Sequence, residues 1–224
     1  MSHRTGYVDT EFLAEAARLL ERDKHASYEM MRIAPHQTVL DVGCGPGTDT
    51  IPMAQIVGSK GLVVGVDHDS DMLQEANQRA AQTGVNAWVR HQRADAHLLP
   101  FHSGVFDACR CERVLQHVAD PEHVLAEMVR VTKPGGWVVA GEPDWASFAV
   151  DVPDPTLIDV ERRLIRYRAD HLARHGYIGR QLYRIFRQRG LEESEIRIIS
   201  IPLTNLPLAR RFLVLDDTED QAIL

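Results

Sequence analysis

Residues 39–47, VLDVGCGPG, constrain the fold more than any other stretch of this chain. The apolar and β-branched residues that lead up to Asp41 are typical of a buried parallel strand. Glycine then occupies three alternate positions, Gly43, Gly45 and Gly47. Glycine at this spacing lets the backbone turn sharply and removes the Cβ atoms that would block a ligand. Because a helix-compatible segment, 48–57, follows at once, the stretch predicts a nucleotide-binding turn that leads into a helix N-terminus.

The spacing of the glycines bears on which nucleotide is bound. A dinucleotide fingerprint reads G-x-G-x-x-G, whereas here the third glycine comes one position early. Asp41 also lies two residues before the first glycine, and a carboxylate does not suit a pyrophosphate. An acid at this position suits a positively charged amino or sulfonium group instead. The loop by itself leaves the choice of nucleotide open.

Composition limits the class of protein. With 224 residues, of which 44% are hydrophobic and 25% charged, the chain is expected to form one ordinary soluble globular domain. No apolar run approaches the ~20 residues of a membrane span, and residues 1–10 lack the apolar core of a signal peptide. The net charge of −7 argues against a nucleic-acid partner. Three cysteines without a C-x-x-C pair predict a reducing cytoplasm and no metal site.

Apolar periodicity predicts an alternation of strands and helices along the chain. Strands are expected at 39–41, 62–66, 87–93, 105–110, 137–141 and 196–201. Helices are expected at 10–22, 28–33, 48–57, 70–82, 120–131 and 156–175, with a shorter one that ends near 189. This alternation is typical of a doubly wound α/β fold, a mostly parallel sheet with helices on both faces. Because 211–215 is a candidate seventh strand, we expect six or seven strands.

Two acids fall at the ends of predicted strands, where ligands collect in open α/β sheets. Asp67 lies 20 residues beyond Gly47, the place of the carboxylate that accepts the ribose hydroxyls of a nucleotide. The alternative role, starting the next helix, suits Asp69 or Ser70 better. Asp95 follows the third strand, where a carboxylate can accept a hydrogen bond from an exocyclic amine such as that of adenine.

Taken together, four stretches resemble the class I S-adenosylmethionine-dependent methyltransferases, in particular the ubiquinone/menaquinone-biosynthesis-like group (methyltransferase type 11). They are VLDVGCGPG, GVDHDSDML, RADAHLLPF and the run FDACRCERVLQHVADPEHVLAEMVRVTKPGGWVVAGEPDW. The resemblance covers residues 37–145 and is much looser from 156 onward. It implies a Rossmann-like core at 36–145, an N-terminal helical cap at 1–35, and lid helices with completion of the sheet at 146–224, all within one domain.

The resemblance implies S-adenosylmethionine as the cofactor and S-adenosylhomocysteine as the product. In the family's pattern, Asp41 lies near the methionine end of the cofactor, and the backbone of the glycine loop contacts that end. Asp67 binds the ribose hydroxyls, and Asp95 accepts from the adenine amine. The Cys111 carbonyl accepts from the cofactor's amino group. The full set of implied cofactor-binding residues is Asp41, Gly43, Cys44, Gly45, Asp67, His68, Asp95, Ala96 and Cys111.

The resemblance also implies that two segments, after the fourth and fifth strands, face the methyl group. Their candidate substrate-contacting residues are Glu112, Arg113, Gln116, Asp144 and Trp145. Methyl transfer to a ready nucleophile is an in-line displacement, so alignment supplies most of the acceleration. A weakly acidic acceptor also needs a base, and His117 is the candidate; the alternative is that its ring only caps the loop. Acids at the end of the fifth strand contact the substrate or are simply solvated.

Arginine concentrates late in the chain. Nine arginines fall between 161 and 189, namely 162, 163, 166, 168, 174, 180, 184, 187 and 189. One interpretation is a solvated basic helix face. The other is that Arg163, Arg166 or Arg180 points inward and holds an acidic group of the acceptor, because the planar fork of arginine matches a carboxylate.

These features favour an enzyme that transfers a methyl group to O, N or C of a small molecule, as a monomer or homodimer in the cytoplasm. A non-catalytic S-adenosylmethionine-binding regulatory relative is the main alternative. An NAD-type oxidoreductase is disfavoured by the glycine spacing and by the later motifs.

Overall fold

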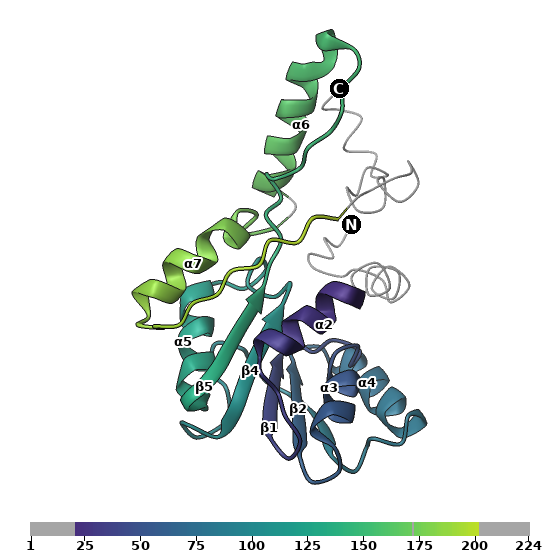
Figure 1. The fold of residues 1–224 in the computed structure, drawn as a ribbon. Coiled ribbons are helices and arrows are strands. Elements are labelled where there is room, and N and C mark those ends of the chain that lie inside the picture. Colours follow the sequence, from purple (N-terminus) through teal and green to yellow (C-terminus); the bar gives the residue numbers. More distant parts are fainter. Residues whose placement is uncertain (1–20, 172, 202–224) are drawn as a thin grey trace.

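The structure, a computed structural model, describes residues 21–171 and 173–201, with side chains from residue 24 onward. Five parallel strands form its central sheet, in the order β3-β2-β1-β4-β5 (Figure 1). They are β1 (Thr38–Val42), β2 (Leu62–Asp67), β3 (Val89–Arg93), β4 (Phe106–Glu112) and β5 (Thr132–Gly141). In the register, Asp41 of β1 lies between Gly65 of β2 and Arg110 of β4. The parallel sheet expected from the sequence is confirmed.

Helices cover both faces of this sheet. They are α2 (Glu21–Met30), α3 (Thr50–Val57), α4 (Ser70–Gln82), α5 (Pro121–Val131), α6 (Ile158–His171) and α7 (Ile178–Gln188), with a short 3-10 helix, η1 (Pro155–Leu157), before α6. Successive strand residues point to opposite faces, so each strand feeds two apolar layers. Val39 packs in the layer that includes residues of α2, α3 and α4, whereas Leu40 packs in the layer that includes α5 and α7. The doubly wound arrangement follows from this alternation.

Side-chain caps fix where two helices begin. The Asp69 carboxylate accepts hydrogen bonds from the backbone N–H groups of Asp71 and Met72 at 2.8 and 3.3 Å. Asp120 caps α5 in the same way, and Pro121 occupies the first helical position, which favours initiation. The cap role predicted for Asp69 is therefore confirmed, and Asp67 is not needed for it.

The predicted strand count is wrong for the part of the chain that the structure describes. Residues 196–201 were expected to form a sixth strand, but they run without strand pairing, and the sheet has five strands. Their apolar side chains are not buried, and Ile198 is 93% exposed. Strand preference depends on burial and on a pairing partner, which this short run lacks here. The candidate seventh strand, 211–215, lies outside the described residues.

The helical prediction also needs adjustment at both ends of the chain. The helix expected at 28–33 begins earlier and forms the last part of α2, while most of the one expected at 10–22 lies outside the described residues. The long helix expected at 156–175 ends at His171, and it projects away from the sheet (Figure 1). Helix α7 instead packs on the sheet through Ile178 and Ile185.

A neutral histidine ties β3 to the helices on one face, and it makes the stability pH-dependent. His91 Nδ1 donates to Asn77 Oδ1 at 3.0 Å, and Nε2 lies 2.8 Å from Thr50 Oγ1. Burial lowers the pKa of His91 to about 4, below the value of about 6.5 expected in the unfolded chain. The stabilisation from the neutral ring is therefore present above pH 6.5 and is lost as the pH falls through about 4.

We expect His91→Gln to flatten the stability profile between pH 7 and pH 4. The wild-type chain should lose about 1–2 kcal/mol more over this range than the variant, roughly half of the full linkage value because the ring is partly exposed. Urea unfolding at a series of pH values measures the difference. His102→Gln, at an exposed surface position, is the matched control. Parallel profiles for wild type and His91→Gln would contradict the role of the neutral ring.

Candidate functional site

The glycine loop lies at the point where the strand order reverses. Strands β2 and β4 flank β1 on opposite sides, so the crevice beyond their carboxyl ends is the position where open α/β sheets bind ligands. Gly43 adopts a positive φ of 71°. A Cβ atom added there would lie 2.2 Å from Val114 Cγ2, so only glycine fits. A Cβ at Gly45 would meet nothing within 4 Å, so the space beside the loop is open.

Asp67 closes the loop from the end of β2. Its Oδ2 accepts a hydrogen bond from the Gly45 N–H at 2.9 Å, and its Oδ1 accepts from the Asp69 N–H at 3.0 Å. A carboxylate has about four lone-pair sites, so further acceptor capacity remains for a ligand. The structure thus places Asp67 against the glycine loop, and its ribose-binding role stays a prediction.

The residues expected beside an adenine ring lie further along the same edge. Asp95 is exposed, and its Oδ1 accepts from both the backbone N–H and the Nδ1 of His97. These hydrogen bonds lower the pKa of Asp95. Ala96 is half-buried, and the His68 side chain is 85% exposed with its Nδ1 3.2 Å from Asp67 Oδ1.

A cluster of ionic side chains lies beside the glycine loop, around Asp41 and Asp49. We call it the ion cluster; it consists of Lys24 and Tyr28 of α2, Asp41 of β1, Asp49 before α3, and Arg110 and Glu112 of β4. Lys24 Nζ and Tyr28 Oη bind the Asp49 carboxylate at 2.6 and 2.5 Å. Arg110 Nη1 lies 3.1 Å from Asp49 Oδ1 and 3.6 Å from Asp41 Oδ1, and Nη2 pairs with Glu112. Helix α2 is therefore fastened to the glycine loop.

The pKa values of two carboxylates of the ion cluster shift in opposite directions. Burial raises the pKa of Asp41 to about 7, against the opposing effect of Arg110. Burial acts in the same sense on Asp49, but Arg110 and Lys24 hold its pKa below the usual value. Asp49 therefore stays ionised, whereas Asp41 changes its charge near neutral pH.

Most of this cluster was not predicted from the sequence. Asp41 and Glu112 were singled out there, but Lys24, Asp49 and Arg110 were not. One signal was present: Arg110 lies between two cysteines in a central strand, and a charge buried in such a strand needs a partner. The pairing of Asp41 with Arg110 in the register supplies that partner.

The EPDW segment at 142–145 links the loop after β4 to the helices that follow. Glu142 Oε1 accepts from the backbone N–H groups of Val114 and Leu115 at 2.8 and 2.7 Å, and Oε2 accepts from Gln116 at 3.3 Å. Burial raises the pKa of Glu142 to about 7, although these three amides act to lower it. Glu142 thus sets the position of the loop that carries the substrate candidates.

Several predicted substrate residues bind one another. The Trp145 indole N–H donates to Gln116 Oε1 at 2.8 Å, and Gln116 is buried. Arg180 of α7 pairs with Asp144 through two contacts of 2.5 and 2.9 Å. These interactions join the loops after β4 and β5 to α7, so the structure brings the EPDW segment and α7 together.

The remaining candidates differ in their exposure to solvent. His117 is exposed, and its ring makes no hydrogen bond within the described part of the chain. Nearby atoms that displace water, and the positive Arg113, lower its pKa. Arg113 follows β4 with a positive φ of 56°. Arg163 and Arg166 lie exposed on the projecting α6. The thiols of Cys44 and Cys111 are buried and free.

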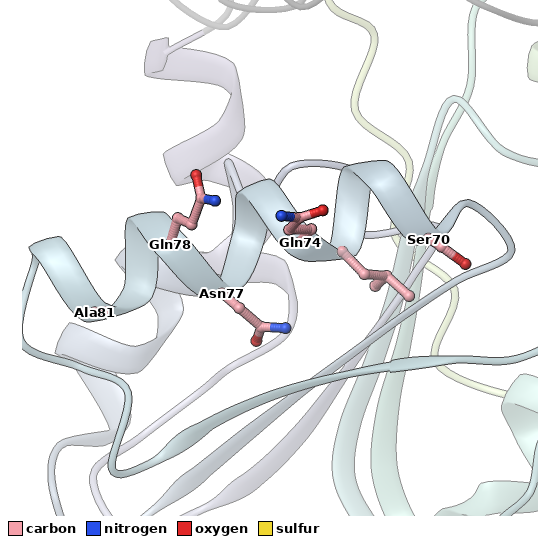
Figure 2. A pocket seen from close by; sticks show the side chains of 6 residues that line it. Ser70, Gln74, Asn77, Gln78 and Ala81 are labelled. Atoms are coloured by element: carbon pink, nitrogen blue, oxygen red, sulfur yellow. The ribbon is translucent and has the colours of Figure 1, made fainter.

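A hollow of about 530 Å³ lies elsewhere, along α4 (Figure 2). It is lined by Ser70, Leu73, Gln74, Asn77, Gln78 and Ala81. None of the predicted site residues lines it, so it has no part in the site.

Within residues 21–171 and 173–201, no group of three or more His, Cys, Asp or Glu side chains could hold a metal ion. No helix of the described part is long and apolar enough to cross a membrane.

Solved structures of other proteins share this fold. A putative methyltransferase from Haloferax volcanii, solved with the Trm112 methyltransferase activator, is 22% identical and covers 91% of this chain and 82% of its own, with a TM-score of 0.64. An S-adenosylmethionine-dependent methyltransferase from Aquifex aeolicus is 22% identical over 72% of this chain and 87% of its own, with a TM-score of 0.56. At this identity the likeness concerns the fold.

Sequence comparison then gives the family. Residues 33–190 match the methyltransferase domain family, and the chain belongs to it. An uncharacterized 37.1 kDa protein in a transposon of Streptomyces fradiae is 36% identical over 97% of this chain and 60% of its own length. A demethylmenaquinone methyltransferase of Bacillus cereus is 35% identical over 66% of this chain and 59% of its own. The chain spans about 60% of the length of these two relatives. The resemblance predicted from the sequence motifs is confirmed.

Proposed function

We propose that the protein transfers a methyl group from S-adenosylmethionine to O, N or C of a small-molecule acceptor. The observation that carries this proposal is the Asp67 carboxylate held against the glycine loop at the reversal of the strand order. Membership of the methyltransferase domain family supports it. The cytoplasmic location and the monomeric or homodimeric state are further parts of this proposal.

The residues present fit the cofactor. Open space beside Gly45 leaves room for the ligand to pass over the backbone, and a Cβ atom there would fill it. Asp67 has acceptor capacity for the ribose hydroxyls, and Asp95 lies exposed where an adenine amine could reach it. Asp41 offers negative charge toward the methionine end. His68, Ala96 and the Cys111 carbonyl complete the proposed set. When bound, the cofactor supplies an electrophilic methyl group on a sulfonium.

The chain's contribution to the reaction is alignment. Glu142 fixes the loop that carries Gln116 and His117, and the Asp144–Arg180 pair holds α7 against the same region. Reacting atoms held in line within a rigid frame need little further help from the protein. The substrate contacts of Glu112, Arg113, Gln116 and Trp145 stay proposals, as do the domain limits at 35 and 145.

Calorimetry with S-adenosylmethionine, S-adenosylhomocysteine and NAD tests the cofactor, and turnover on a panel of small phenols, amines and carbon acids tests the activity. We expect binding of the first two ligands and no binding of NAD. Binding without turnover on any acceptor would favour the regulatory alternative. Binding of NAD alone would overturn the proposal.

His117 is proposed as a base for weakly acidic acceptors. Its lowered pKa keeps the ring neutral, and so able to accept a proton, at pH 7. We expect His117→Asn to reduce kcat on a phenol roughly 100-fold or more but to leave transfer to a thiol nearly unchanged. Steady-state kinetics on the two acceptors, with His102→Asn as control, measure this. Equal losses on both acceptors would assign the ring a structural role.

The roles of Arg166 and Arg180 can be distinguished by comparing a charged acceptor with a neutral one. If Arg166 holds an acidic group, Arg166→Ala should slow transfer to a carboxylated acceptor roughly tenfold or more and leave transfer to its methyl ester unchanged. Arg180→Ala should slow both transfers alike, because Arg180 already binds Asp144. Steady-state kinetics of both variants on the acid and on the ester distinguish these roles. Identical kinetics for Arg166→Ala and wild type would favour the alternative, that the arginines of α6 form a solvated basic face.

A further inference from the structure

The strand order places the ion cluster at one end of the proposed cofactor site. Along the carboxyl edge of the sheet, β3, β2, β1 and β4 follow one another, so Asp95, Asp67, the glycine loop and Glu112 lie in that sequence. If the adenine lies at Asp95 and the ribose at Asp67, the methionine portion extends over β1 and β4. Its sulfonium then comes toward the ion cluster.

The buried charges of the ion cluster do not cancel. Lys24 and Arg110 supply two positive charges, while Asp41, Asp49 and Glu112 supply three negative ones when ionised. Tyr28 donates a neutral hydroxyl, because burial raises the pKa of its phenol far above the usual value. Burial likewise keeps the thiols of Cys44 and Cys109, near Asp41, protonated by raising their pKa values. One negative charge is left over.

Among the described residues, Arg113 is the further cation that approaches the cluster, and the Glu142 carboxylate also interacts electrostatically with Glu112. Its Nε lies 3.9 Å from Glu112 Oε1, and its side chain is 28% exposed. Water therefore screens this contact far more than the contacts of Arg110, whose side chain is buried. Arg110 Nε is itself buried and has no hydrogen-bond partner among the described residues. The cluster is thus incompletely compensated in charge and in hydrogen bonding, and an incompletely compensated buried charge is costly.

We propose that the excess negative charge of the ion cluster makes the site select the sulfonium cofactor over its neutral product. S-adenosylmethionine carries one more positive charge than S-adenosylhomocysteine and differs from it by a single methyl group. A buried negative charge therefore stabilises the first ligand more than the second and assists release of the product. This inference rests on the proposed function.

The selectivity depends on pH through Asp41. Protonation of its carboxyl removes the excess charge, and burial places that pKa near 7. The ratio of the dissociation constants of product and cofactor should therefore be larger at pH 8 than at pH 6. The groups facing Asp41 are Arg110 and Glu112 of β4, Asp49 and Lys24.

The test is calorimetric titration of the full chain with S-adenosylmethionine, S-adenosylhomocysteine and sinefungin, an analogue with an amine at the sulfonium position. Asp41→Asn and Glu112→Gln should lower the preference for the two charged ligands roughly five- to tenfold. Lys24→Met should raise that preference, and Lys24→Arg, which keeps the charge, should leave it unchanged.

The outcomes separate the inference from the function on which it rests. Binding of neither S-adenosylmethionine nor S-adenosylhomocysteine to the wild-type chain would contradict the proposed function. Binding of both with the same preference in wild type and all folded variants would overturn the charge selectivity alone. If the variants do not fold, the ratio of the two dissociation constants is measured for the wild-type chain at pH 6 and pH 8. An equal ratio at both pH values excludes the role of Asp41.

Discussion

Replacement of Asp67 by alanine is expected to weaken S-adenosylhomocysteine binding roughly 10- to 100-fold. The carboxylate is the charged acceptor at the end of β2, and its loss leaves the two ribose hydroxyls without a partner. Loss of such a hydrogen bond to a charged group typically costs about 1.5–3 kcal/mol. Asp67 also accepts from the Gly45 N–H, so the loop loses an internal tether as well.

Calorimetry on the folded variant measures this loss. Asp71→Ala is the matched control, because Asp71 is an exposed acid in the first turn of α4. Circular dichroism and thermal unfolding establish that both variants fold. An unchanged affinity in a folded Asp67→Ala protein would count decisively against the proposed position of the cofactor.

Glu142→Ala is expected to have the largest effect on stability. The substitution leaves the backbone N–H groups of residues 114, 115 and 116 without their acceptor. Each unsatisfied buried donor costs about 1–3 kcal/mol, and water entering the space recovers part of it. We expect a loss of about 3–5 kcal/mol in the free energy of unfolding, together with a loss of turnover, because the loop that carries Gln116 and His117 is released.

Urea unfolding and steady-state kinetics test this expectation. Glu142→Gln separates shape from charge, since it keeps the size of the side chain but offers one oxygen acceptor in place of two. Glu122→Ala removes an exposed carboxylate paired with Arg189 at 3.2 Å, and it should cost at most about 1 kcal/mol. If Glu142→Ala unfolds at the same urea concentration as Glu122→Ala, the carboxylate does not hold the loop.

Local sequence was enough to predict the elements of the core and part of the site. The glycine spacing, the apolar strand before Asp41 and the acid at the end of the next strand are short-range patterns, each read within a few residues. The helix predicted at 70–82 has those bounds in the structure, because Asp69 caps its first turn. The sequence likewise predicted Asp67 at the end of the second strand, and the parallel order of the strands brings that end to the glycine loop.

The roles of residues that meet across the sheet could not be predicted in this way. Asp144 and Arg180 were separate substrate candidates in the sequence, yet they lie 36 positions apart and pair with each other. Arg110 finds Asp49 only because β4 lies beside β1. The run at 196–201 has the composition of a strand, but it remains unpaired in the structure.

The sequence by itself determined the order of strands and helices, the glycine turn and the acids at the strand ends, because backbone conformation and local apolar periodicity are properties of neighbouring residues. The tertiary structure alone decided which charges are buried together, which polar groups hold the loops, and which apolar run joins the sheet. The physical reason is that burial and pairing depend on partners supplied by distant parts of the chain. Arg110 is an example, since a charged residue in a central strand becomes the centre of an ion cluster once α2, β1 and the start of α3 pack around it.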